Sequence, residues 1–219
     1  MEKAVILDFM GVVADFDCLK LILDTPLKDK LTSGRLVFRL SNMHELKNIF
    51  KRYKSGEIDQ TELTKQLCGN DKKLSVLIPS ILHKIPDYIT PNESVIQHIR
   101  ELKNSGVKII ILSNTIPETE YVIKKLKLED LCDDIICSTH VGVTKPDLKI
   151  FDYVVKKHQL DTSHTIYIDD SKKNLQSAEK FGIETFLVKN SGETDSLLDD
   201  YQFYIDFINS CESENCIFY

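Results

Sequence analysis

The sequence lacks the features of a membrane or exported protein. No apolar run in its 219 residues approaches the roughly 18 that a membrane-spanning helix needs. The first residues, Met1-Glu2-Lys3 before a short strand-like stretch, do not have the layout of a signal peptide. With 8 glycines and 6 prolines, the chain also lacks the composition of fibrous or disordered proteins. We therefore expect a folded, cytoplasmic protein with no membrane partner.

Positive charge and paired cysteines are scarce as well. The formal net charge is -6, which argues against a general attraction to nucleic acid phosphates or anionic lipids. The six cysteines include no CxxC pair, and the six histidines form no HxH or HExxH pattern. Cys216 loosely fits a prenylation signal, but the final tyrosine and the absence of a preceding basic stretch disfavour lipidation. We expect reduced thiols, no zinc site and no nucleic acid partner.

What the chain does contain is a series of apolar stretches rich in β-branched residues. Because they do not alternate with polar residues, they predict strands that are covered on both faces, as in parallel sheets. These stretches are the run that ends at Asp8 and residues 107–112, 134–137, 165–168 and 185–188. Helix-like segments lie between them, at 92–104, 118–127, 147–158 and 172–181. Such alternation predicts an α/β fold with a doubly wound parallel sheet.

Residues 15–86 break this alternation. They contain no convincing strand and four helix-like patterns, at 18–23, 43–53, 60–68 and 74–83. We predict an α/β core made of residues 1–14 and 87–219, with residues 15–86 as a helical cap over the carboxyl edge of the sheet. One more amphipathic helix is expected over residues 193–209.

Polar residues follow the predicted strands at their carboxyl ends, where ligands of open parallel sheets bind. Each alone has an ordinary structural explanation, such as a strand end, a turn or a helix start. Together, and in this order, they are hard to explain as coincidences. The residues are Asp8, Ser113 and Asn114, Lys145, and Asp169 and Asp170, with Asn174 one helical turn further on.

Three carboxylates at one edge repel one another unless a cation lies between them. Oxygen ligands with room for water and a phosphate indicate Mg²⁺. Asp8, beside a metal-neutralised phosphorus, then acts as a nucleophile and forms an aspartyl phosphate. Polar and cationic side chains near it would hold the phosphoryl oxygens. The expected phosphate-binding residues are Ser113, Asn114 and Lys145, and the expected metal ligands include Asp8, Asp169, Asp170 and Asn174.

Four stretches resemble the four motifs of the haloacid dehalogenase-type hydrolases. They are residues 6–13 (Ile-Leu-Asp-Phe-Met-Gly-Val-Val), 111–114, 142–146 and 167–174. Within that superfamily, residues 53–58 and 145–151 and the fourth motif are similar to the small sugar-phosphatase branch and to the phosphatase domain of soluble epoxide hydrolases. The resemblance implies a Rossmann-like core with a helical cap. It also implies Mg²⁺-dependent hydrolysis of a small phosphorylated metabolite, such as a sugar phosphate.

Met10 departs from the family pattern. Most phosphatases of this family carry a second aspartate there, which protonates the leaving oxygen and also binds Mg²⁺ through its backbone carbonyl. Met10 retains the carbonyl, so the metal site can survive, but the acid is lost. Such proton transfer typically contributes about 10²- to 10⁴-fold in rate.

Several readings of Met10 stay open. The enzyme could act on esters with a good leaving group, or Asp15 or Asp17 could supply the acid, although both also suit solvated loop positions. The protein could instead be a catalytically impaired module that binds phosphate or a partner. A 2-haloacid dehalogenase is the third reading, but those enzymes work without a metal, which would leave Asp169 and Asp170 in repulsion. Candidate contacts for the rest of a substrate are Arg35, Arg39, His44 and Tyr53 in the predicted cap, and His140 near Lys145, which more simply reads as a loop residue.

Overall fold

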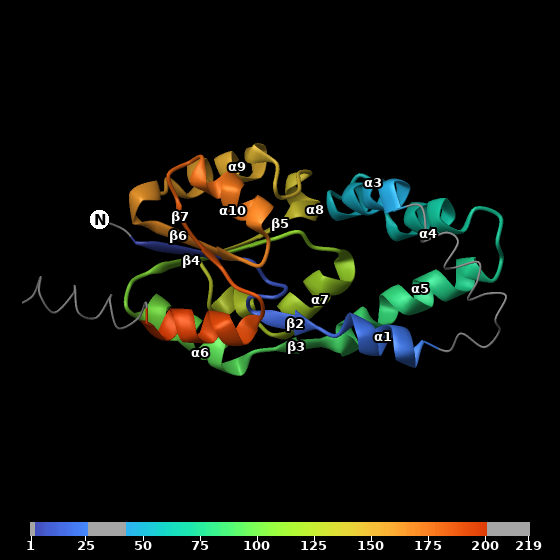
Figure 1. Ribbon diagram of the computed structural model, residues 1–219, viewed down its shortest axis with the longest axis horizontal. Coiled ribbons are helices and arrows are strands. Elements are labelled where there is room, and N and C mark those ends of the chain that lie inside the picture. Colours follow the sequence, from blue (N-terminus) through green and yellow to red (C-terminus); the bar gives the residue numbers. More distant parts are fainter. Residues whose placement is uncertain (1–2, 26–42, 201–219) are drawn as a thin grey trace, which may run out of the picture.

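The computed structural model describes residues 3–25 and 43–200. Its centre is a five-stranded sheet of order β5-β4-β1-β6-β7, in which every neighbouring pair is parallel (Figure 1). The strands are β1 Ala4–Leu7, β4 Lys108–Ser113, β5 Asp134–Cys137, β6 Thr165–Asp169 and β7 Glu184–Leu187. All five strands predicted from the apolar stretches are therefore present, and the α/β fold class is confirmed.

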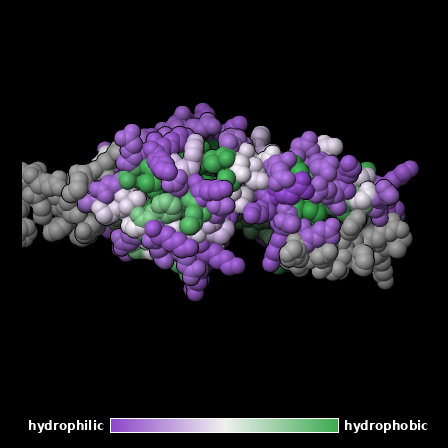
Figure 2. Space-filling view, turned by 90° about the horizontal axis from the view of Figure 1, so that it is seen from above, coloured by the Kyte–Doolittle hydropathy of each residue, from purple (hydrophilic) through white to green (hydrophobic). Residues whose placement is uncertain are grey.

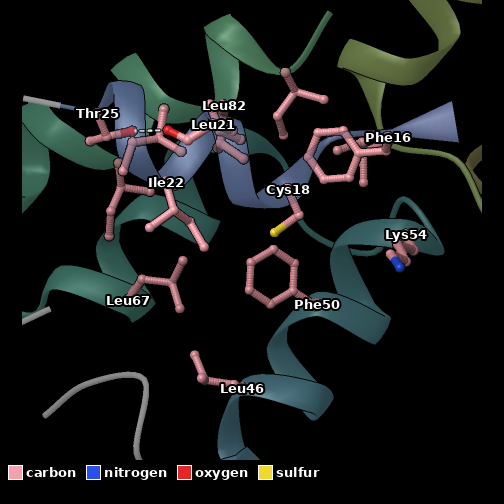
Figure 3. A pocket seen from close by; sticks show the side chains of 14 residues that line it. Phe16, Cys18, Leu21, Ile22, Thr25, Leu46, Phe50, Lys54, Leu67 and Leu82 are labelled. Carbon is pink, nitrogen blue, oxygen red and sulfur yellow. Dashed lines mark hydrogen bonds between the residues drawn. The ribbon is translucent and has the colours of Figure 1, made fainter. Parts of the chain in front are cut away.

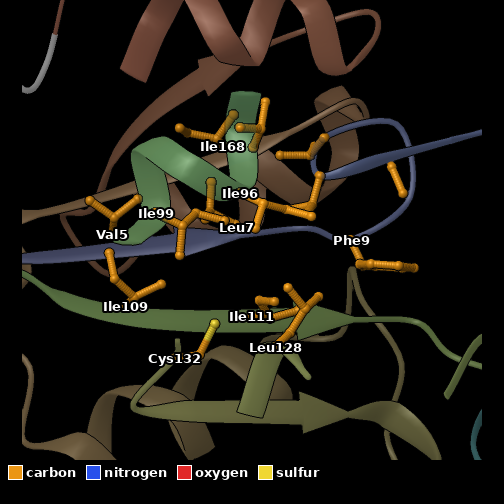
Figure 4. Packing of buried hydrophobic residues seen from close by; sticks show 14 of the residues in the cluster. Val5, Leu7, Phe9, Ile96, Ile99, Ile109, Ile111, Leu128, Cys132 and Ile168 are labelled. Carbon is orange, nitrogen blue, oxygen red and sulfur yellow. The ribbon is translucent and has the colours of Figure 1, made fainter. Parts of the chain in front are cut away.

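Helices cover both faces of the sheet (Figure 1). Alternate strand residues point to opposite faces, so the strands contribute side chains to two separate apolar clusters. Val5 and Leu7 belong to one cluster with α6 and α7, whereas Ile6 belongs to the other with α9 and α10. Figure 4 shows the first cluster. The helices are α6 Glu93–Asn104, α7 Pro117–Lys125, α8 Ser138–Val141, α9 Leu148–His158 and α10 Lys172–Glu179, and the short 3₁₀ turns are η2 Leu128–Asp130 and η3 Thr162–His164.

The predicted helices lie close to the observed ones because polar side chains cap their first turns. Asn92 accepts hydrogen bonds from the Ser94 and Val95 amides at the start of α6, and Asp147 accepts one from Lys149 at the start of α9. Residues 191–200 are helical, in agreement with the expected last helix, whose remainder lies outside the described residues. None of the helices in the described ranges is long and apolar enough to span a membrane.

In the described residues between β2 Ala14–Phe16 and β3 Ile89–Pro91 there are four helices and a 3₁₀ turn; we call this segment the helical insertion. They are α1 Cys18–Asp24, α3 Met43–Lys54, α4 Gln60–Cys68, α5 Leu74–Lys84 and η1 Ile85–Tyr88. The insertion has an apolar cluster of its own and lies beyond the carboxyl ends of the strands (Figure 1). Hydrophilic side chains cover much of both parts on the α9 and α10 side (Figure 2).

Two short strands and one short helix were not expected from the sequence. β2 and β3 pair antiparallel, with Asp15 opposite Thr90, and so join both ends of the helical insertion to the core. The expectation of no strand within residues 15–86 was therefore wrong at β2. Three residues are too few to show a strand periodicity, and the pairing partner lies far away along the chain. The four-residue helix α8 was missed for the same reason.

Candidate active site

The strand register brings the carboxylates of the first and fourth motifs to one edge. Leu7 pairs with Ile168 of β6, and the amide of Asp8 donates to the Ile168 carbonyl at 3.0 Å. Asp8 therefore lies beside the end of β6, where Asp169 and Asp170 follow. The side-chain Oδ1 of Asp8 accepts from the Phe9 amide at 2.6 Å, which fixes the direction of the carboxylate.

Gly11 allows the loop after β1 to lie against Asp170. Its φ is +80°, and a Cβ atom there would be 2.9 Å from the Asp170 Oδ2. A side chain at this position would meet both a strained backbone and the carboxylate. The glycine amide donates to the Ala14 carbonyl at 2.7 Å, which closes the loop. A glycine is thus required for the loop and Asp170 to be in contact.

Lys145 lies between two carboxylates. Its Nζ is 2.9 Å from the Asp8 Oδ2 and 2.8 Å from the Asp169 Oδ2, and the residue is only 4% exposed. Asn114, which follows β4, holds the lysine backbone by two hydrogen bonds: it accepts from the Lys145 amide at 2.8 Å and donates to the Lys145 carbonyl at 2.9 Å. The second and third motifs are therefore joined through this pair. Burial alone would lower the pKa of Lys145, but the two carboxylates hold it above its usual value.

Asp169 is fully buried and accepts hydrogen bonds from several donors. Asn174 donates from Nδ2 to both carboxylate oxygens, at 2.9 and 3.0 Å, and the Ser171 amide donates at 2.7 Å. The Tyr167 hydroxyl donates to Oδ2. Burial would raise the pKa of Asp169, but Lys145 and these donors hold it below its usual value. Asp169 is thus a fixed anion that positions Lys145.

The negative charges of Asp8 and Asp170 are compensated less completely than the charge of Asp169. Burial, together with the charge of Asp169, raises the pKa of Asp8 to about 6 despite the contact with Lys145. Burial and Asp169 also raise the pKa of Asp170. Oxygen atoms of Asp8, Asp169 and Asp170 lie within 4.8 Å of one another. Three carboxylates with one contacting ammonium group, among the described residues, carry excess negative charge that a divalent cation would neutralise.

The other predicted site residues lie at the same edge. Ser113 ends β4 and is buried, and the half-buried Met10 packs against the apolar cluster that contains Leu7. Asn174 was predicted as a metal ligand, and its amide group contacts Asp169. Direct ligation by Asn174 stays a prediction.

The two acids considered as substitutes for Met10 are engaged elsewhere. Asp15 accepts hydrogen bonds from the Ser191 amide at 3.1 Å and from the Ser191 hydroxyl at 2.6 Å. Asp17 accepts from the Lys20 amide at 2.8 Å and caps α1. The expectation of a solvated loop residue holds for the exposed Asp17, but it was wrong for Asp15, which is half-buried in β2.

The predicted substrate-contacting residues have varied positions. His140 lies in α8, so its reading as a loop residue was wrong; its ring is exposed, and its Nε2 lies 3.2 Å from the Glu120 Oε2. Tyr53 is buried and donates from its hydroxyl to both oxygens of Glu118, at 3.3 and 3.2 Å. Arg35 and Arg39 lie outside the described residues, as does the side chain of His44. Tyr53 thus joins the helical insertion to α7.

Lys54 was missed by the sequence reasoning. It ends α3, and its carbonyl accepts from the Ser138 hydroxyl at 2.5 Å. Two residues later, Gly56 has a φ of +70°, and a Cβ atom there would be 2.6 Å from the Thr139 carbonyl. The turn after α3 therefore lies directly on α8. Burial and the charge of Lys145 lower the pKa of Lys54, and Asp8 partly offsets them, which places this ammonium group within electrostatic reach of the site.

A basic cavity of about 620 Å³ lies between α3 and the Lys145 loop. Its charged lining residues are Lys47, Lys51, Lys54, Lys145 and Asp147, and Asn114 lies among them. Lys145 is already paired with Asp8 and Asp169, but Lys47, Lys51 and Lys54 against one lining aspartate still create a positive potential that attracts anions. The arrangement suits an anionic ligand.

Comparisons with known proteins agree with the geometry. A family model described as haloacid dehalogenase-like hydrolase matches residues 40–188. The D-ribitol-5-phosphate phosphatase of Bacteroides thetaiotaomicron is 27% identical over 206 residues, covering 88% of this chain and 95% of its own. The sesquiterpene phosphatase astK of Aspergillus oryzae is 24% identical over 182 residues, covering 83% and 87%.

Solved structures share the fold. A HAD family enzyme of Bacteroides thetaiotaomicron, crystallised with magnesium and inorganic phosphate, has a TM-score of 0.69 at 20% identity, over 85% of this chain and 94% of its own. The L-2-haloacid dehalogenase of Xanthobacter autotrophicus has a TM-score of 0.57 at 19% identity, over 84% and 76%. The parallel sheet with helices on both faces is common to these proteins.

Proposed function

The chain belongs to the haloacid dehalogenase-like hydrolases, and from this membership we propose that it is a Mg²⁺-dependent phosphatase acting on a small phosphomonoester. The observation that carries the proposal is the cluster of Asp8, Asp169 and Asp170 around one buried lysine, next to a basic cavity. Relatives named as phosphatases support the reaction class. We further propose that residues 15–86 act as a cap, since Lys54 and Gly56 of this segment contact α8, which directly follows β5.

In the proposed reaction, a carboxylate oxygen of Asp8 attacks phosphorus as the bond from phosphorus to the ester oxygen breaks, and water then hydrolyses the aspartyl phosphate to release inorganic phosphate and free Asp8. Lys145 keeps Asp8 ionised and in place, and Ser113 faces the phosphoryl oxygens from the end of β4. Asn114 retains one amide hydrogen beyond its bond to the Lys145 carbonyl, and that hydrogen is available for a phosphoryl oxygen. Asp8, Asp169, Asp170 and the Met10 carbonyl would hold Mg²⁺, with Asn174 as a further candidate. When bound, the ion neutralises negative charge on these groups and on the phosphate.

The leaving oxygen needs a proton, and Met10 has none to give. Its side chain packs against apolar residues, and Asp15 and Asp17 already accept hydrogen bonds from Ser191 and Lys20. Lys54 lines the basic cavity together with Lys145, and burial lowers the pKa of its ammonium group. A lowered pKa makes an ammonium group a better acid. We assign Lys54 the role of proton donor to the leaving group.

Hydrolysis of p-nitrophenyl phosphate tests the reaction class, because its phenolate leaves without needing a proton. We expect Mg²⁺-dependent release of p-nitrophenolate by the purified protein, and loss of the activity in EDTA with recovery on adding Mg²⁺. A panel of phosphorylated metabolites under the same conditions would then rank the substrates.

Two outcomes would contradict the proposal. If the protein binds phosphate without any turnover, it is a phosphate- or partner-binding module. The missing acid at Met10 would then explain the absence of turnover. Metal-independent release of chloride from 2-chloropropionate would favour the dehalogenase reading. In that case Asp169 and Asp170 would need another source of neutralisation than a metal ion.

Met10→Asp is expected to raise kcat/KM most on esters with poor leaving groups, such as alkyl or sugar phosphates, by about 10- to 10²-fold. The variant restores a carboxylic acid beside the leaving oxygen, whereas p-nitrophenyl phosphate should change little. Steady-state kinetics on one substrate of each kind measure the difference.

Lys54→Gln, made alone and together with Met10→Asp, tests the role of Lys54 by a double-mutant cycle. In the wild-type background it should reduce turnover of poor leaving groups more than turnover of p-nitrophenyl phosphate. In the Met10→Asp background its effect should shrink, because the new carboxyl group takes over the proton transfer. Equal effects of Lys54→Gln on both substrates in both backgrounds would show that the lysine only binds the substrate.

A further inference from the structure

A second cavity, of about 440 Å³, lies within the helical insertion between α1, α3, α4 and α5 (Figure 3). Its lining among the described residues is apolar, with three exceptions: Lys54, Cys18 and Thr25. The Thr25 hydroxyl already donates to the Leu21 carbonyl at 2.7 Å. This volume lies within the range of small-molecule sites, whose walls are mostly apolar with a few polar groups at fixed places.

The apolar cavity and the basic cavity beside the proposed active site share lining residues. Lys54 lines both this cavity and the basic cavity beside Lys145. Ile116, which follows Ser113 by three residues, also lines the apolar cavity, so the core contributes to its wall. Figure 3 shows Lys54 and Phe16 at one end, with Leu67 and Thr25 far from them. A ligand whose phosphate lies at Asp8 could therefore extend past Lys54 into an apolar space.

We propose that this cavity binds the organic part of the substrate, and that the substrate is the monophosphate of an apolar alcohol with an alkyl or alkenyl chain. The inference rests on the proposed phosphatase function for the phosphate end. A polyol chain would bury hydroxyl groups against described lining side chains that offer almost no hydrogen-bond partners, which costs affinity. An apolar chain gains affinity with each methylene group that leaves water.

Binding of straight-chain alkylphosphonates, from methyl to octyl, tests the proposal in the presence of Mg²⁺. These compounds carry the phosphate-like head and cannot be hydrolysed. Isothermal titration calorimetry should show affinity rising about two- to fourfold per methylene until the cavity is filled. Ribitol 5-phosphate should bind no more tightly than methylphosphonate. An affinity that is independent of chain length would overturn the proposal.

Ile22 and Leu23 offer a matched pair of variants on α1. Both are exposed, at 55% and 74%, but only Ile22 is among the described residues that line the cavity. Ile22→Glu should weaken octylphosphonate binding at least tenfold, because a carboxylate would face the alkyl chain. Leu23→Glu places the same charge on the neighbouring residue and should retain wild-type affinity. Equal losses in both variants would point to a general effect of charge on α1 and would overturn the cavity assignment.

This experiment can fail separately from the phosphatase proposal. Turnover of p-nitrophenyl phosphate combined with chain-independent phosphonate binding would leave the phosphatase standing and remove the apolar substrate. Chain-dependent binding without turnover of any phosphate ester would do the reverse, and would make the protein a binder of apolar phosphates.

Discussion

Lys145→Met is expected to destabilise the metal-free protein by about 3–5 kcal/mol at pH 7.5, in line with the loss of one partner from a buried ion pair. The lysine Nζ contacts Asp8 at 2.9 Å and Asp169 at 2.8 Å, and methionine leaves these two buried carboxylates facing each other. Turnover should fall by at least about 10²- to 10³-fold, because a charged donor to the phosphoryl oxygens is lost. Urea denaturation in EDTA and steady-state kinetics measure the two effects.

The pH dependence separates this cause from a simple packing defect. With the lysine gone, Asp8 should remain protonated to a higher pH than in the wild-type protein, where its pKa is already about 6. A protonated Asp8 no longer repels Asp169, so the stability deficit of the variant should be smaller at pH 5.5 than at pH 7.5. Adding Asp8→Asn to Lys145→Met should recover part of the loss for the same reason.

Lys156→Met is the matched control. Lys156 forms an ion pair with Asp152 at 2.8 Å, but both side chains are exposed on α9. An exposed pair of this kind contributes about 0–1 kcal/mol. A similar loss of stability in both lysine variants, or a deficit of Lys145→Met that does not change with pH, would show that the buried carboxylates are not the cause.

Much of the fold follows from the sequence because a fully covered parallel strand has a distinct pattern. β5 was predicted at residues 134–137 and is observed at Asp134–Cys137, since the run Asp-Ile-Ile-Cys sits between clear breaks. α4 was predicted at 60–68 and is observed at Gln60–Cys68, with Asp59 as its N-cap. β2 and β3 escaped prediction because their stability comes from pairing across 70 or more residues and not from local pattern, as with Asp15 and Thr90.

The cluster at the sheet edge was predictable for a related reason. Ser113 and Asp169 end parallel strands and Asp8 directly follows one, and the register of such strands places their carboxyl ends side by side. No such rule predicts the position of Lys54, because that position depends on how the helical insertion packs on α8. Gly56, whose backbone lies against Thr139, is the signal in the sequence that could have suggested a close approach there. The hydrogen bond from the Ser191 amide to Asp15 also joins residues far apart in the sequence, so no local pattern predicts it.

Asp8→Asn is expected to abolish turnover and, at the same time, to stabilise the metal-free protein at pH 7.5. The amide cannot attack phosphorus as a carboxylate does, so hydrolysis of p-nitrophenyl phosphate should fall to background. The gain in stability arises because burial and Asp169 raise the pKa of Asp8 from 3.8 to about 6, which means that the ionised carboxylate is less favourable in the folded chain than in the unfolded one. A shift of this size corresponds to roughly 2–3 kcal/mol.

The pH window of this gain is fixed by the direction of the shift. Below about pH 4, Asp8 is protonated in both the folded and unfolded chains, so Asp8→Asn should have little effect on stability there. The wild-type protein should lose stability relative to the variant as the pH rises through about 4 to 6, and the difference should be constant above that range.

Lys145 retains Asp169 as a partner in the variant, so its charge stays paired. Thermal melts in EDTA at pH 4.0 and 7.5 measure the gain. Mg²⁺ should narrow the difference between the two proteins at pH 7.5, because the ion stabilises the ionised Asp8 of the wild-type site. A variant that is less stable than wild type at pH 7.5, or whose gain is the same at pH 4.0, would show that Asp8 is not the strained carboxylate of this cluster.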